Sequence, residues 1–181
     1  MNQAIANAEL HRALTVKDTD TPKGEPAQFI TFTIGTEEYG IDIMAVREIK
    51  GWTETTTMPK APLHVRGVIN LRGIIIPIYD LRARFGMGLT ETTKTHVIII
   101  ISVGSRIVGI LVDAVSDILS IDRDAIHPPP EMDHKTEDWF IDGLVALGER
   151  MVTLVSLDRL ISEPVAAESL PVPSLPAPIQ N

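Results

Sequence analysis

Apolar and polar residues alternate in two neighbouring segments, 28–34 and 39–43, which are separated by the turn-forming stretch Gly35–Glu38. The alternating apolar residues are Ile30, Phe32, Ile34, Tyr39, Ile41 and Ile43. A period of two is typical of strands with one buried face. The pattern therefore predicts two adjacent strands joined by a short turn.

Longer apolar runs follow later in the chain. Val97–Val103 and Ile107–Val112 are of strand length and flank a Gly104-Ser105 turn, and Met151–Val155 predicts a further strand. Two stretches, Met44–Lys50 and Asp113–Leu119, instead place apolar residues three positions apart. That spacing predicts two short helical segments.

The stretch Gly67–Leu81, GVINLRGIIIPIYDL, is the centre of the predicted organisation. Two β-branched runs flank Asn70–Gly73, where Asn and Gly tolerate the positive φ of a tight hairpin turn. This predicts a hairpin with Arg72 at its tip. Pro77 is expected at a sheet edge or strand end because it lacks an amide donor. Asp80 is expected to cap a short helix over 81–85.

An internal repeat emerges when the sequence is shifted against itself. A shift of 69 places Gly40-Ile41 on Gly109-Ile110, and a shift of 76 places Gly67 on Gly143. The repeat predicts two similar all-β units, roughly 28–94 and 95–162, each of about five strands. Closed barrels that share a core, and that exchange a strand, would protect the sheet edges of such small units.

The remaining segments differ in composition. Residues 1–27 lack sustained periodicity and are expected to form a flexible tail, and a short helix capped by Ser156 is expected at the end of the domain. Residues 163–181 contain five prolines among small residues, which is typical of a disordered tail. A single domain over 28–162 is therefore expected.

Composition limits the possible functions. The chain has a net charge of −8 and no cysteine, which disfavours nucleic-acid binding and excludes thiolate chemistry. The first ten residues lack the pattern of a signal peptide, and no apolar run is long enough to span a bilayer, so a cytoplasmic location is expected. Five basic residues and one acid lie between Lys60 and Arg84, whereas nine acids lie between Asp113 and Asp142. Such asymmetry favours oriented association with partners, although solvated faces would have the same composition.

Catalytic motifs are absent from the sequence. The densest group of ligand-type side chains lies in His127–Asp138, but its spacing matches no helical HExxH motif. An acidic solvated loop explains it better than a metal-dependent hydrolase, which remains the alternative from another functional class. Pro128–Pro130 could form a polyproline II ligand, but no basic-flanked PxxP site accompanies it. We expect no enzyme activity, metal or cofactor.

Four motifs resemble the CheW family of bacterial chemotaxis coupling proteins. They are FTIGTEEYGIDIMAVREI (32–49), GVINLRGIIIPIYDLRARF (67–85), VGILVDAVSDIL (108–119) and GLVALGERMVTLVSLDRL (143–160). The resemblance implies two intertwined five-stranded barrels of the Src-homology-3 type with a few short helices. It also implies a non-enzymatic adaptor that joins the cytoplasmic tips of chemoreceptors to the histidine kinase CheA, as a monomer that enters membrane-associated receptor arrays.

Position by position, the resemblance implies two contact sets and a third contact. The receptor-facing set comprises Val46, Glu48, Gly67 and Arg72. The kinase-facing set comprises Val97, Ile98, Gly73 and Gly109. A ring-forming contact is expected near Arg123 and Pro128. A CheW-like adaptor of another chemosensory pathway, for surface motility or a different output, is the alternative function.

Overall fold

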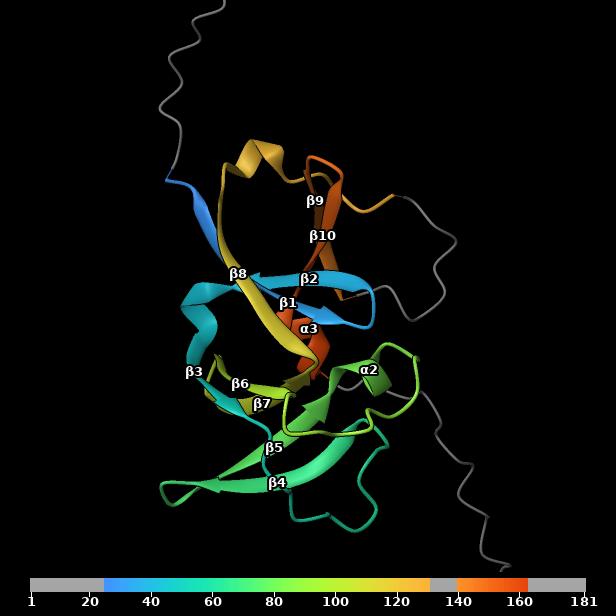
Figure 1. Ribbon diagram of the computed structural model, residues 1–181. Coiled ribbons are helices and arrows are strands. Elements are labelled where there is room, and N and C mark those ends of the chain that lie inside the picture. Colours follow the sequence, from blue (N-terminus) through green and yellow to red (C-terminus); the bar gives the residue numbers. More distant parts are fainter. Residues whose placement is uncertain (1–24, 131–139, 163–181) are drawn as a thin grey trace, which may run out of the picture.

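A computed structural model describes residues 25–130 and 140–162, and within them ten strands form two five-stranded sheets (Figure 1). The first sheet has the order β8 (Ala114–Ile121), β1 (Ala27–Ile34), β2 (Glu37–Asp42), β10 (Arg150–Val155) and β9 (Ile141–Leu147). The second has the order β3 (Val46–Gly51), β6 (Val97–Val103), β7 (Arg106–Val112), β5 (Ile74–Asp80) and β4 (Val65–Leu71). The expected all-β class with few helices is confirmed. Of the expected tails, 1–27 and 163–181, residues 1–24 and 163–181 lie outside the described residues, and β1 begins at Ala27, inside the expected N-terminal tail.

Each sheet combines strands from both sequence repeats. The β1–β2 hairpin joins β8, β9 and β10, whereas the β6–β7 hairpin joins β3, β4 and β5. The repeats thus exchange a whole hairpin: the second sheet is formed by the consecutive strands β3–β7, whereas the first combines β1 and β2 with β8–β10 from the end of the domain.

The strand pairing repeats with the same shifts as the sequence. In the second sheet β5 runs parallel to β7 with Ile78 opposite Gly109, and in the first β10 runs parallel to β2 with Leu154 opposite Gly40. Gly109 lies 69 positions after Gly40, and Leu154 lies 76 after Ile78. A Cβ on Gly109 would lie too close to the side chains of Ile78 and Ile98, so any larger residue would force these buried side chains to shift.

Buried apolar residues form three clusters, one for each sheet and one shared. The cluster of the second sheet contains Ile69, Ile76, Ile78, Ile98, Ile100 and Leu111. That of the first contains Ile121, Val145, Val152 and Leu154. The largest cluster draws residues from both exchanged hairpins, including Phe32, Ile41, Ile99 and Ile110. Because this shared core needs strands from both repeats, the two sheets form one structural unit.

The two expected helical segments are strands. Residues 46–51 form β3 and residues 114–121 form β8, and only Ile43–Ala45 is helical, as the single 3-10 turn η1. A β-bulge explains the error: Val46 pairs with Ile101 and Glu48 with Ile100, so β3 carries one extra residue. The bulge places Val46 and Ile49, three positions apart, on one face. The β8 strand has the equivalent irregularity opposite Ile30 and Phe32.

The short helices begin where the sequence predicts. Asp80 caps α2 (Leu81–Arg84) by accepting a hydrogen bond from the Ala83 amide, and Gly86 follows with a φ of 73°. The Ser156 side chain, in contrast, makes no capping hydrogen bond to α3 (Leu157–Ile161). The expectation that Pro77 lies at a sheet edge or strand end is wrong, because Pro77 lies inside the central strand β5; β7, however, pairs only with residues 78–80 of that strand. The missing amide donor therefore breaks no β5–β7 hydrogen bond.

Candidate functional site

The β4–β5 hairpin projects from the second sheet with Arg72 at its tip, as predicted (Figure 1). Its turn residues are Arg72, with φ 52°, and Gly73, with φ 89°. Two successive positive φ values match a type I′ turn, whose twist fits an antiparallel pair. We expected Asn70 to adopt a positive φ. Instead, its Oδ1 accepts a hydrogen bond from the Gly73 amide at 2.8 Å and so fixes the turn.

Arg72 contacts a residue from a distant strand. Its Nη1 lies 2.9 Å from Oε2 of Glu48 on β3, and the two side chains are 75% and 30% exposed. The strands β3 and β4 occupy opposite ends of the sheet order, so the sheet curls to bring them together. A backbone bridge between Thr56 and Val68, with N–O distances of 2.8 and 2.9 Å, also links the segment that follows β3 to the edge strand β4. Arg72 and Glu48 are therefore brought together by the fold.

Gly67 lies beneath this closure and is buried. It has a φ of 134°, and a Cβ at this position would collide with the Thr56 carbonyl. Glycine alone permits both this conformation and the close approach of the backbone. Gly67 therefore shapes the site and exposes no side chain to a partner.

Two isoleucines next to Arg72 were not singled out in the sequence. Ile74 and Ile75 are 53% and 61% exposed. In the sequence they begin the run III, which resembles a buried strand, so the pattern alone gives no sign of their exposure. We call Glu48, Arg72, Ile74 and Ile75 the hairpin surface. It combines exposed apolar area with an ion pair, a composition that suits protein binding.

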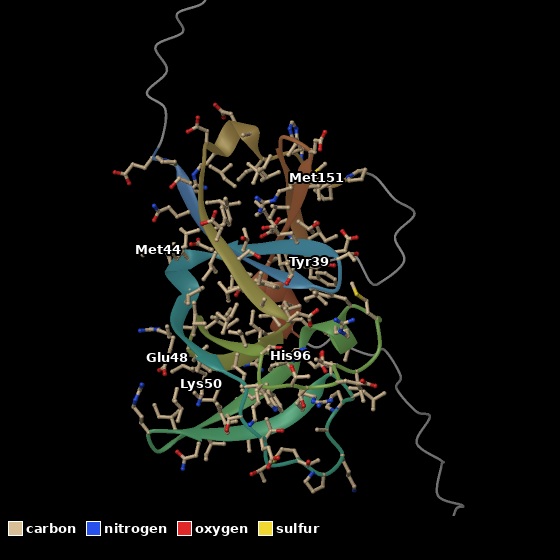
Figure 2. The ribbon with its side chains drawn as sticks, in the orientation of Figure 1. Tyr39, Met44, Glu48, Lys50, His96 and Met151 are labelled. Carbon is tan, nitrogen blue, oxygen red and sulfur yellow. The ribbon has the colours of Figure 1, made fainter. Side chains whose placement is uncertain are left out.

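Val46 lies at the start of β3 and is half-buried, packed against the shared core. Figure 2 shows Glu48 and Lys50 further along the same strand. Val46 was expected in the helical segment Met44–Lys50. It lies instead on an edge strand, from which it can contact a partner only through its exposed part.

The kinase-facing set divides into exposed and buried members. Val97 is half-buried, and Gly73 is exposed at the hairpin turn. Ile98 is 0% exposed, and Gly109 is buried where β7 meets β5. Val97 packs toward the shared core and Ile98 toward the second-sheet core, so they point to opposite faces. The structure brings these four residues onto one sheet but not into one exposed patch.

Arg123 and Pro128 lie on the opposite half, around the short helix η2 (Arg123–Ala125), and both are exposed. His127 bridges to Leu144 through two backbone hydrogen bonds of 2.8 and 2.9 Å. The rest of the densest ligand-type group, 131–138, lies outside the described residues. Within 25–130 and 140–162, no group of three or more acidic or histidine side chains could hold a metal ion.

None of the helices in the described ranges is long and apolar enough to cross a membrane. Side chains typical of catalysis also gather at no single place in the site described above. The hairpin surface is made of strands and a tight turn.

Comparison with known proteins agrees with this architecture. Residues 28–165 match the model of the CheW-like domain. The chain is 51% identical over 133 residues to the chemotaxis protein CheW of Rhizobium meliloti, an alignment that covers 74% of this chain and 86% of the relative. It is 48% identical over 136 residues to a probable chemotaxis protein CheW of Rhizobium etli, covering 75% and 88%.

The fold is also similar to a solved structure. The crystal structure of the scaffolding protein TtCheW from Thermoanaerobacter tengcongensis matches with a TM-score of 0.69 and 36% identity, covering 75% of this chain and 92% of that one. The family model, the relatives and the fold agree, and the chain belongs to the CheW family.

Proposed function

We propose that the protein is a non-enzymatic chemotaxis adaptor that couples the cytoplasmic tips of chemoreceptors to the histidine kinase CheA. Through this coupling, the receptors control autophosphorylation of the kinase. The observation that carries the proposal is the hairpin surface, where an exposed ion pair and two exposed isoleucines lie on a CheW-type scaffold. Such a surface binds partners without chemistry.

The receptor contact is formed by Glu48, Arg72 and the exposed part of Val46. The ion pair orients the approaching receptor helix, because charges at the rim of an interface contribute to specificity and encounter more than to affinity. Apolar side chains beside it supply the anchoring contact. Gly67 supports this surface from below and makes no contact with the receptor.

The kinase contact uses Val97 and Gly73, the accessible members of the second set. Ile98 and Gly109 act through the fold, since both are buried. Substituting them changes the position of β6 and β7, and kinase binding weakens as a consequence. The contact near Arg123 and Pro128 joins adaptors and kinases into rings on the opposite half of the molecule.

Each interface is of modest size, about 800 Å² per partner, with an affinity near one micromolar, or about −8 kcal/mol. Many weak contacts made together in an array give strong overall binding. The protein is therefore cytoplasmic and monomeric alone, and reaches the membrane only through receptors.

Reconstitution tests this function. The purified chain, a CheA kinase and receptor-bearing vesicles are sedimented together while kinase autophosphorylation is followed. The kinase is expected to enter the pellet and become activated only when the chain is present. Binding of the kinase without the receptor would assign the chain to another pathway, and binding of neither would refute the proposal.

A further inference from the structure

The two halves of the molecule present corresponding surfaces at opposite ends (Figure 1). The β9–β10 hairpin corresponds to β4–β5 with a shift of 76, and β8 and β2 correspond to β3 and β7 with a shift of 69. A partner that recognises the hairpin surface on one half therefore meets a related surface on the other. The two surfaces must differ if the partner is to bind at only one of them.

The second surface keeps several features of the first. Asp117 occupies the position that corresponds to Glu48, and Ile118, 55% exposed, corresponds to Ile49, 45% exposed. Met151 is 55% exposed at the position that corresponds to Ile75 (Figure 2). An acidic edge strand and exposed apolar residues are therefore present on both halves.

The two surfaces differ mainly in the side chains at two corresponding positions. The β4–β5 half has exposed isoleucines, Ile74 and Ile107, where the β9–β10 half has Arg150 and Glu38. The tip residue differs as well, since Gly148 stands at the position of Arg72. Two apolar residues on one half are thus replaced by opposite charges on the other.

The two charged residues form a bidentate ion pair. The Arg150 Nη2 lies 2.7 Å from Oε1 of Glu38, and its Nε lies 3.2 Å from Oε2. The Glu38 side chain is only 13% exposed. The hydrogen bond from Arg150 to Glu38, and the attraction between their charges, raise the pKa of the Arg150 guanidinium.

We propose that Glu38 and Arg150 are specificity determinants that prevent the receptor tip from binding to the β9–β10 half. An apolar side chain docking there would have to strip water from the ion pair without replacing its hydrogen bonds. On the β4–β5 half the same side chain meets Ile74 and Ile107. This inference rests on the proposed function, because it assumes that the hairpin surface binds the receptor.

Reciprocal substitutions test the proposal. The variant E38I/R150I carries the isoleucines of the other half, and I74R/I107E carries its ion pair. Binding of a soluble cytoplasmic receptor fragment to the full chain is measured by isothermal titration calorimetry, and sedimentation velocity gives the stoichiometry. The wild type is expected to bind one fragment, E38I/R150I two, and I74R/I107E to bind at least tenfold more weakly.

The swapped variant E38R/R150E is the matched control, because it retains an ion pair and is expected to bind one fragment. Circular dichroism and thermal melting establish that each variant is folded. If folded E38I/R150I still binds one fragment with wild-type affinity, or I74R/I107E binds like the wild type, the specificity role is refuted while the proposed function stands. If the wild type binds no fragment, receptor coupling fails, and this inference fails with it.

Discussion

The Glu48–Arg72 ion pair is exposed enough that its contribution to folding and its contribution to binding can be separated. Pairs of this kind stabilise a protein by only about 0.2–1 kcal/mol. We predict that Glu48→Ala and Arg72→Ala each weaken binding to receptor vesicles by at least fivefold, while the melting temperature changes by only a few degrees. Co-sedimentation and thermal unfolding measure the two effects.

Arg159→Ala is the control for this prediction. Arg159 forms an exposed ion pair with Asp142 at 3.5 Å, away from the hairpin surface. Its loss should leave receptor binding unchanged. A large loss of stability in Arg72→Ala with unaltered binding would assign the hairpin pair a structural role only.

The free energy of unfolding should depend on alkaline pH through the hydroxyl of Tyr39. Its ring is buried and lies 4.9 Å from that of Phe85, and burial, followed by the charge of Glu37, raises the pKa of its hydroxyl above 10.0. Because the folded-state pKa is the higher one, the stability from the neutral hydroxyl is complete below about pH 10 and is lost as the pH rises through the raised value. Tyr39→Phe keeps the ring, so urea unfolding should show a smaller alkaline loss than in the wild type. Equal losses would contradict this role.

Among the strands and turns, two glycines of the β4–β5 region should respond differently to alanine. Gly67→Ala places a methyl group against the Thr56 carbonyl at a positive φ, so we predict a loss of about 2–4 kcal/mol. Gly73→Ala meets no atom within 4 Å, although its φ is also positive, and should cost only about 1–2 kcal/mol. Denaturant unfolding compares the two. A milder effect at Gly67 would contradict the close approach described here.

Asp80 is the buried anchor of the segment between β5 and β6. It is 0% exposed and accepts hydrogen bonds from the Thr90 amide at 2.9 Å and the Thr90 hydroxyl at 2.7 Å. Asp80→Ala leaves the buried Thr90 amide without this acceptor, so we predict a loss of about 3 kcal/mol in the free energy of unfolding. The exposed Asp124→Ala should change it by less than about 0.5 kcal/mol. Similar values for the two variants would contradict the prediction.

The sequence correctly predicts most of the strands and helices but assigns two strands as helical segments. The alternation of Ile30, Phe32 and Ile34 identifies β1, and Asp80 identifies the start of α2. The strands β3 and β8 were misread because a bulge gives them the three-residue spacing of a helix. Bulges depend on the partner strand, which lies some 50 to 90 positions away in the chain. Local spacing cannot reveal them.

The candidate site could be predicted only in part, because some of its features depend on contacts between residues that are far apart in the sequence. The hairpin and the exposed tip at Arg72 follow from local turn chemistry, and the structure places Glu48 beside this tip. The exposure of Ile74 and Ile75 depends on where neighbouring strands end. The burial of Ile98 and Gly109 depends on β5 and β7 pairing in parallel. Such long-range contacts leave no periodic signal.

For the whole molecule, hairpin exchange predicts that neither repeat folds alone. Fragments 25–94 and 95–162 each lack strands that complete a sheet, and units of about 65 residues are marginal in any case. We predict that each fragment is unfolded by circular dichroism and that an equimolar mixture regains the native spectrum. The matched control is the uncleaved 25–162 chain. A native-like spectrum from either fragment alone would refute the interdependence of the repeats.

The pairing of β2 with β10 sets the order of events during synthesis. Glu38 pairs with Val152, so the first hairpin waits for more than a hundred further residues before its sheet is complete. Ribosomes add about 5–20 residues per second, so Phe32 and Ile41 stay without their native cover for several seconds. The second sheet, whose strands β3–β7 are consecutive in the chain, has all its strands once Val112 has emerged, whereas the first sheet still lacks β8–β10. The apolar first hairpin therefore has an unpaired edge, open to aggregation, until its last neighbour β10 emerges.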